Sequence, residues 1–194
     1  MNVAPITDEG LLLEQVLLRT RGTLPGRRPP LVAIDGLGGA GKTTLARRLA
    51  ELAEGQSISV DDYVVPQQGS YLPHLRYDVL SRDLVAARES SAKVIVLEGL
   101  CIRSVLAKLE SVPDVTVYVR RVDEYGEWTD EHYFSEDNDL EEILETFRRL
   151  ETVPGIGDHD RETARYHILE KPISRADFVY DRVRQPPPGT VASA

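Results

Sequence analysis

A glycine-rich segment that ends in lysine and threonine carries the strongest chemical signal in this sequence. Residues 36–43 read Gly-Leu-Gly-Gly-Ala-Gly-Lys-Thr, which matches the pattern Gly-x4-Gly-Lys-Ser/Thr in full. Glycines at this spacing let backbone amide groups turn inward around phosphate oxygens, the lysine adds a charge for the outer phosphates, and the hydroxyl is a ligand for Mg²⁺. The pattern predicts a phosphate-binding loop that consists of Gly36, Leu37, Gly38, Gly39, Ala40, Gly41, Lys42, Thr43 and Thr44.

The segments on either side of this loop suit the same purpose. Residues 31–35 form a short apolar run that fits a buried strand, and the stretch from Lys42 to about Glu54 has leucines on one helical face. A helix that starts at the loop presents unpaired amide groups and its positive dipole end to the same anion. The alternative is a glycine-rich turn that binds nothing. We expect the Lys42 side chain to be at the surface when no ligand is bound.

Carboxylates follow two other predicted strands. Asp61 and Asp62 come after the predicted strand 57–60, and Glu98 comes directly after Val-Ile-Val-Leu. In a parallel sheet these strand ends open at one edge beside the phosphate loop, where carboxylates hold Mg²⁺ or accept a proton from an attacking hydroxyl. The alternative is that each carboxylate caps the next helix. That alternative is the stronger one for Asp62 and for Asp35, which precedes the loop.

Short apolar runs alternate along the chain with helical patterns. The predicted strands are 31–35, 57–60, 94–97, 115–119 and 176–180. The predicted helices are 7–20 with Thr7 as its N-cap, 42–54, 78–88 with Asp78 as its cap, 140–150 and 161–169. Such alternation favours parallel pairing with right-handed crossovers. We therefore predict an α/β fold in three layers, a five-stranded parallel sheet with helices on both faces.

Taken together, these residues resemble the uridine kinase branch of the P-loop kinases, a plan that phosphoribulokinase and pantothenate kinase share. The resemblance rests on Ile34-Asp35-Gly36 leading into Gly-Lys-Thr-Thr-Leu-Ala, on Asp61-Asp62-Tyr63 and on Glu98-Gly99-Leu100. It extends over most of residues 31–180, with weaker matches at Tyr166-His167, Pro172 and Ala176-Asp177.

The resemblance implies a kinase that transfers the terminal phosphoryl group of ATP or GTP, with Mg²⁺, to a hydroxyl group. By this resemblance Asp61 matches the proposed general base, Glu98 and Thr43 lie in the shell of the metal, and Tyr77 and Asp78 contact the hydroxyls of the acceptor. Members of the family phosphorylate nucleosides, sugar phosphates and vitamins with one catalytic core. The acceptor is therefore a nucleoside-like or other small molecule that the sequence does not name.

A long acidic stretch departs from the family pattern. Family lids usually carry several arginines after the fourth strand, whereas here 11 acidic residues and no lysine or arginine lie between Val122 and Phe147. We interpret residues 120–150 as a lid-like insertion. Its acids either form a solvated surface or, with Trp128 and Tyr133, select a cationic alcohol. Trp128, Tyr133 and Phe134 can also be the local core of the insertion. The arginines that could supply charge to a lid are Arg120, Arg121, Arg148, Arg149, Arg161 and Arg165.

Length and composition limit the number of domains and the kinds of partner and site that this chain can have. A chain of 194 residues with 41% hydrophobic residues fits one domain, here 1–184, with a helix and linker over 1–30 and a disordered tail over 185–194. A net charge of -9 argues against a nucleic-acid partner. No apolar run approaches the roughly 20 residues that a membrane span needs. The single cysteine, Cys101, excludes an intrachain disulfide and a zinc cluster. These features predict a cytoplasmic protein of unknown oligomeric state that acts on a small molecule.

Other P-loop proteins remain as alternatives. A P-loop NTPase would hydrolyse its nucleotide and act through a protein partner, and a nucleotide sensor would bind ATP with Mg²⁺ without turnover. A nucleoside monophosphate kinase is a closer alternative, but no clear set of arginines for a monophosphate is present. A small acceptor that raises the rate of nucleoside diphosphate release would distinguish a kinase from the NTPase and from the sensor.

Overall fold

The computed structural model describes residues 4–20, 28–66, 69–153 and 156–183. Its centre is a parallel sheet of five strands in the order β2-β3-β1-β4-β5, so the predicted fold class is confirmed. The strands are β1 (Leu31–Gly36), β2 (Gln56–Ser59), β3 (Ile95–Glu98), β4 (Val115–Val122) and β5 (Phe178–Val183). The α-helices are α1 (Glu9–Thr20), α2 (Lys42–Leu52), α3 (Tyr77–Glu89), α4 (Ile102–Lys108), α5 (Glu131–Phe134), α6 (Leu140–Arg149) and α7 (Asp158–Glu170).

Strand β1 lies in the middle of the sheet, and both of its faces are covered by helices. All six of its residues are buried, and successive side chains point to opposite sides of the sheet. Leu31 and Ala33 pack in one hydrophobic cluster with residues of α3 and α4. Val32 and Ile34 pack in a second cluster with residues of α1 and α2. A continuous apolar run therefore suits this position better than an alternating one.

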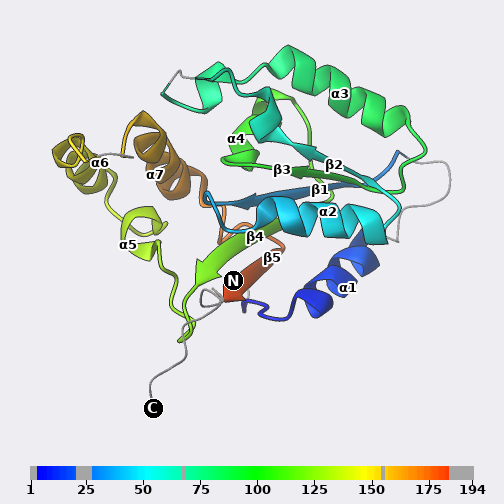
Figure 1. Cartoon of the computed structure of the whole chain (residues 1–194), viewed down its shortest axis with the longest axis horizontal. Coiled ribbons are helices and arrows are strands. Elements are labelled where there is room, and N and C mark those ends of the chain that lie inside the picture. The colour runs from blue at the N-terminus through cyan, green and yellow to red at the C-terminus, as the bar shows by residue number, and fades with distance from the viewer. Residues whose placement is uncertain (1–3, 21–27, 67–68, 154–155, 184–194) are drawn as a thin grey trace, which may run out of the picture.

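The helices form the outer layers of a three-layer molecule, and Figure 1 shows them on both sides of the sheet. The carboxyl ends of the strands point to the left of that view, where α5, α6 and α7 lie beyond the sheet. Short 3-10 turns at Val60–Tyr63 and Leu72–His74 connect β2 to α3 at the same edge. This edge therefore gathers the segments in which the candidate site residues were predicted.

Two predicted helix caps are wrong by one or two residues. Helix α1 begins after Asp8, whose Oδ1 accepts the Leu11 amide at 2.8 Å, so Asp8 takes the place expected for Thr7. Both residue types can cap a helix, and local pattern does not separate them. Helix α3 begins at Tyr77 with Arg76 at its N-cap, which places Asp78 inside the first turn. Asp78 still interacts favourably with the helix dipole there.

Strand β4 is longer than predicted and includes Arg120 and Arg121. Its pairing with β5 continues to Val122, and Val122 forms a bridge with Trp128. The two arginines are therefore strand residues at the carboxyl edge of the sheet and do not follow the strand. The hydrophobic pattern stops at Val119, whereas the backbone ladder continues because β5 is there to pair with it.

The acidic stretch is used mainly for structure. Asp139 caps α6 by accepting the Glu142 amide at 2.9 Å, and Asp123 accepts the Tyr125 and Glu127 amides at 2.9 Å each. Glu136 accepts the backbone amides of Ile173 and Ser174. Several of the remaining acids, among them Glu124, Glu127 and Glu131, are exposed. This arrangement matches the solvated surface that was one of the two expectations.

The aromatic residues of the stretch form local cores. Trp128 is 8% exposed and packs with Val122 and with Leu37 of the glycine-rich loop. Tyr133 and Phe134 pack against a cluster that contains Ile143 and Phe147. The insertion is thus anchored to the loop by a buried tryptophan, which leaves little of that ring for stacking on an acceptor.

Some predicted features lie outside the described residues. These are most of the linker before β1, the tail over 185–194, and Pro154 and Gly155 of the turn before α7. Among the described residues, no helix is long and apolar enough to cross a membrane.

Candidate active site

The glycine-rich loop joins β1 directly to α2. Gly36, Gly39 and Gly41 have φ angles of 145°, 72° and 100°, a region of backbone conformation that favours glycine. A side chain at Gly36 would also collide with the Val119 carbonyl of β4. Within the described structure, α2 has no side-chain cap and no acidic residue in its first turn. Its first amide groups therefore remain available to an anion.

The Lys42 side chain is buried, which contradicts the expectation that it lies at the surface. It is 6% exposed, and its ammonium donates a hydrogen bond to the Leu37 carbonyl at 2.9 Å. Burial lowers the pKa of Lys42, and the charges of Asp61, Glu98 and Asp35 oppose that shift. The loop folds back over its own lysine, because the Leu37 carbonyl of the loop accepts the ammonium hydrogen bond.

Thr43 and Glu98 lie together as predicted. The Thr43 hydroxyl donates to Glu98 Oε1 at 2.9 Å, and Glu98 is 1% exposed. Its other oxygen, Oε2, is buried and has no hydrogen-bond partner among the described residues. A buried carboxylate oxygen without a partner is costly unless a cation or water completes it. The pair therefore fits a Mg²⁺ ion that is held mainly by nucleotide phosphates and water.

Asp61 stands in the 3-10 turn that follows β2, at the same strand edge. Its side chain is exposed to solvent on one side, and its Oδ1 accepts a hydrogen bond from the Tyr71 hydroxyl at 2.7 Å. The charge of Asp61 opposes the lowering of the Lys42 pKa. Because Asp61 is exposed, its carboxylate is accessible to a second substrate.

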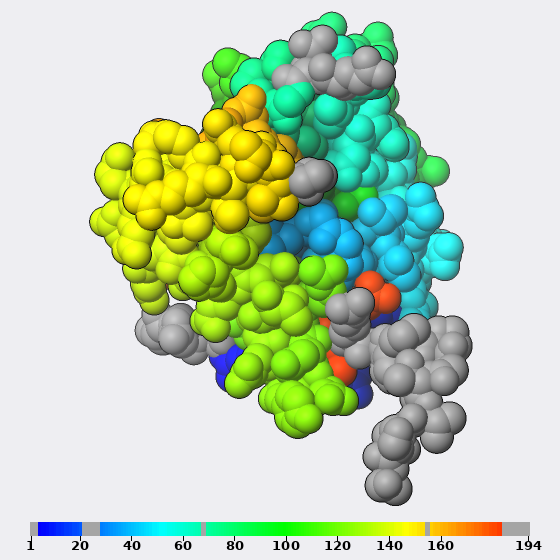
Figure 2. All heavy atoms as spheres, turned by 60° about the vertical axis from the view of Figure 1, so that its left-hand side comes forward, coloured from blue at the N-terminus to red at the C-terminus, as the bar shows by residue number. Residues whose placement is uncertain are grey.

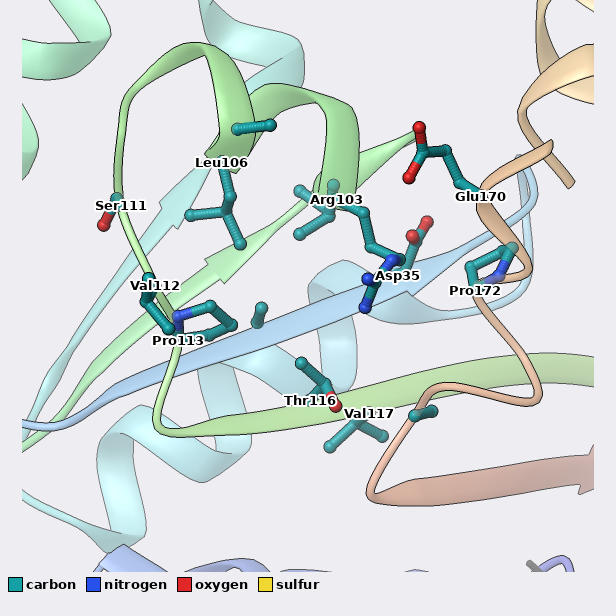
Figure 3. Close-up of a pocket in the computed structure, with 14 residues that line it drawn as sticks. Asp35, Arg103, Leu106, Ser111, Val112, Pro113, Thr116, Val117, Glu170 and Pro172 are labelled. Carbon is teal, nitrogen blue, oxygen red and sulfur yellow. The ribbon is translucent and has the colours of Figure 1, made fainter. Parts of the chain in front are cut away.

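Asp35 has a structural place. Its Oδ2 accepts a hydrogen bond from the Tyr166 hydroxyl of α7, and its Oδ1 accepts the Gly36 amide at 2.8 Å. Burial raises the pKa of Asp35 to about 6, while Tyr166, the Gly36 amide and Lys42 act in the opposite direction. Figure 3 shows Asp35 beside Arg103 at one end of a hollow of about 230 Å³ that Leu106 and Val117 also line. Asp35 therefore ties β1 to α7.

Two arginines that were not predicted as site residues flank the glycine-rich loop. Arg182 at the end of β5 lies so close that a side chain at Gly41 would collide with its guanidinium, and Arg121 approaches Gly39 from β4. Together with Gly39, Ala40 and Val183 they line a cavity of about 750 Å³. Arg121 was considered only as a source of lid charge and Arg182 was not considered, because only the pairing of β4 with β5 brings both to the loop.

Several arginines that were considered as sources of lid charge are engaged with neighbouring acids. Arg148 and Arg149 both pair with Glu145 of their own helix, and Arg161 pairs with Glu151 and Asp158. Arg120 forms a two-bond ion pair with Asp181 of β5 at 2.6 and 2.7 Å. These pairs stabilise the lid and the sheet edge, and they do not identify a catalytic arginine.

Tyr77 and Asp78, which were predicted to contact the acceptor, lie in the first turn of α3. Tyr77 is half-buried against the cluster that covers α3 and α4, and burial raises its pKa, with Glu162 and Cys101 adding to the shift. Asp78 is exposed. Figure 2 looks onto this edge, and the blue atoms around the loop lie between the yellow lid and the cyan to teal segment that includes residues 46–80.

Comparison with known proteins gives a match in fold only. No protein-family model and no curated protein matches the sequence. A solved structure described as a possible uridine kinase from Bacillus stearothermophilus has a TM-score of 0.54 and 18% identity, covering 89% of this chain and 97% of that one. A structure described as a fructose transport system kinase from Silicibacter sp. TM1040 has a TM-score of 0.54 and 17% identity, covering 90% and 99%. The expected resemblance in fold is therefore confirmed.

Proposed function

We propose that this chain is a small-molecule kinase that transfers the terminal phosphoryl group of ATP or GTP to a hydroxyl of a nucleoside-like or other small acceptor. One observation carries the proposal, which is an exposed carboxylate, Asp61, that follows β2 at the edge where the neighbouring strand β3 ends in Glu98, the partner of Thr43, and where the loop lysine follows β1. Under this proposal residues 1–184 act as one cytoplasmic domain, and residues 120–150 act as its lid. The fold shared with two structures described as kinases supports the same reaction class.

The donor half of the mechanism follows from the loop. The α2 amides and Lys42 hold the outer phosphates, and the cavity between Arg121 and Arg182 has room for the remainder of the nucleotide. Thr43 and Glu98 would hold Mg²⁺, which when bound neutralises charge on the phosphate oxygens. Since Lys42 is already placed by the Leu37 carbonyl, little reorganisation is needed when the nucleotide binds.

The acceptor half depends on Asp61. The hydroxyl of the acceptor gives its proton to the Asp61 carboxylate while its oxygen forms a bond to the terminal phosphorus. The bond from phosphorus to the bridging oxygen breaks in line, and the nucleoside diphosphate leaves. Tyr77 and Asp78 orient the acceptor from the start of α3. Most of the rate gain comes from positioning and electrostatics.

The proposal is tested by a screen of acceptors that follows release of nucleoside diphosphate from ATP and from GTP. The classes to compare are nucleosides, pantothenate-like alcohols, sugars and cationic alcohols. We expect one class to raise the release rate and to yield a phosphorylated product by mass spectrometry. Steady hydrolysis that only a protein accelerates would support the NTPase alternative. Nucleotide binding without any turnover would support the sensor.

Glu98→Gln should change the dependence on Mg²⁺. Glutamine keeps the shape and can still accept the Thr43 hydroxyl, but the buried oxygen loses its negative charge. We expect the Mg²⁺ concentration for half-maximal rate to rise by roughly tenfold or more, the scale seen when a metal site is weakened. The measurement is a Mg²⁺ titration at saturating nucleotide. Glu51→Gln on the surface of α2 is the matched control, and an unchanged titration for Glu98→Gln would refute the metal assignment.

A further inference from the structure

Tyr71 makes the closest contact to the candidate base. Its side chain is 6% exposed, and its hydroxyl donates to Asp61 Oδ1 at 2.7 Å. Burial and the charge of Asp61 raise the pKa of Tyr71 far above its ordinary value, with a hydrogen bond from the Leu100 amide acting in the opposite direction. The hydroxyl therefore stays protonated at neutral pH and donates to Asp61.

The backbone of Tyr71 is held from a distant helix. Glu162 of α7 accepts the Tyr71 amide at 2.6 Å and the Leu72 amide at 3.1 Å. One carboxylate thus fixes the start of the Leu72–His74 turn, 91 residues away in the sequence. The tyrosine is anchored at both its backbone and its hydroxyl.

The sheet edge leaves room for this tyrosine. A Cβ on Gly99 would lie 3.0 Å from the Tyr71 hydroxyl oxygen and 2.8 Å from the Cβ of Val60. Gly99 directly follows the metal-site candidate Glu98. The Tyr71 hydroxyl therefore passes across the end of β3 to reach Asp61 at the end of β2, and a larger residue at position 99 would block it.

We propose that Tyr71 is the positioning residue of the base and that Glu162 holds it in place from the lid side. The Tyr71 hydroxyl donates a hydrogen bond to Oδ1 of Asp61, and no described residue donates a hydrogen bond to Oδ2. Oδ2 is thus the oxygen that takes the proton of the acceptor, in an orientation that Tyr71 sets. The kinetic part of this inference rests on the proposed kinase function.

The test is Tyr71→Phe, which removes one hydroxyl and keeps the ring. We expect kcat to fall by roughly tenfold to a hundredfold, as misplacement of a catalytic group does, while KM for the nucleotide and the melting temperature change little. Tyr63→Phe is the matched control, because the Tyr63 hydroxyl donates to Asp83 at 3.0 Å in the same region. An unchanged kcat in Tyr71→Phe would overturn the proposal.

A double-mutant cycle separates positioning from a general loss of structure. In an Asp61→Asn background the base is gone, so adding Tyr71→Phe should change kcat by no more than about twofold. Glu162→Ala should lower kcat in the same direction as Tyr71→Phe and should add little to it. Equal losses from Tyr71→Phe with and without Asp61 would show that the tyrosine acts on structure alone and would refute the proposal.

A structural readout covers the case in which the kinase proposal itself fails. If the parent protein shows no turnover that depends on an acceptor, crystal structures of the parent and of Tyr71→Phe still decide the matter. Under the proposal, the Asp61 carboxylate has one orientation in the parent and leaves it in the variant. An unmoved Asp61 in the variant would overturn the inference about Tyr71, whatever the reaction is.

Discussion

Replacing Lys42 with alanine or methionine should reduce turnover by roughly a hundredfold or more, the scale expected when a charge that faces the transferring group is removed. The physical reason is that its ammonium is a fixed positive charge at the end of the phosphate loop, held there by the Leu37 carbonyl. Asp61, Glu98 and Asp35 all influence its pKa. Without Lys42 these carboxylates face a polyanion with no fixed cation between them.

Because Lys42 is buried, the two substitutions test different things. Alanine removes the ammonium and its volume, whereas methionine fills a similar volume and removes only the charge. Both leave the Leu37 carbonyl without its donor, which costs about 1–3 kcal/mol for a buried group. Melting temperatures are therefore measured beside initial rates and nucleotide affinity. Arg47→Met, an exposed cation on the same helix, is the control, and a folded Lys42→Met with parental kinetics would contradict the phosphate-site assignment.

Asp61→Asn should lower the rate of phosphoryl transfer by roughly a hundredfold or more, in line with the contribution of a general base. Asparagine keeps the shape and can still accept the Tyr71 hydroxyl bond, so the fold and the position of the side chain should persist. It cannot take the proton of the acceptor. Under the proposed mechanism Asp61 faces the acceptor, so nucleotide affinity should change far less than kcat.

Asp62→Asn is the matched comparison for this prediction, because it changes the same residue type one position along the same exposed turn. Single-turnover rates with saturating nucleotide and acceptor provide the readout. An equal loss in both variants would mean that the turn as a whole, and not Asp61, carries the effect. A loss in Asp61→Asn that appears only in nucleotide affinity would place the carboxylate on the donor side and contradict its assignment as the base.

Local features were predictable from the sequence because they depend on neighbours in the chain. The glycines of residues 36–41 and the Lys42-Thr43 pair specify a loop whose amides turn inward, and the apolar run before it specifies a buried strand. The parallel pairing of the strands followed from the alternation of strands and helices along the chain. That Asp61 and Glu98 lie at one edge of the sheet was predictable for a similar reason, since residues at or just after the carboxyl ends of parallel strands reach the same edge.

Element ends were less predictable because several residues at each end can serve equally well. Asp8 caps α1 in place of Thr7 although both types are good caps. The choice is made by the helix register that buries Leu12, Leu13 and Val16. Strand β4 continues to Val122 because β5 pairs with it there. The sequence of residues 120–122 alone does not predict that pairing.

The contacts that complete the site were decided only by the tertiary structure. Tyr71 and Glu162 are brought together across 91 residues, and Tyr166 and Asp35 across 131. Arg121 and Arg182 meet the loop because β4 and β5 end beside it. Such contacts arise from how the crossover segments pack against the sheet, so no local periodicity predicts them. The phosphate loop, in contrast, consists of consecutive residues, so the sequence alone predicts it.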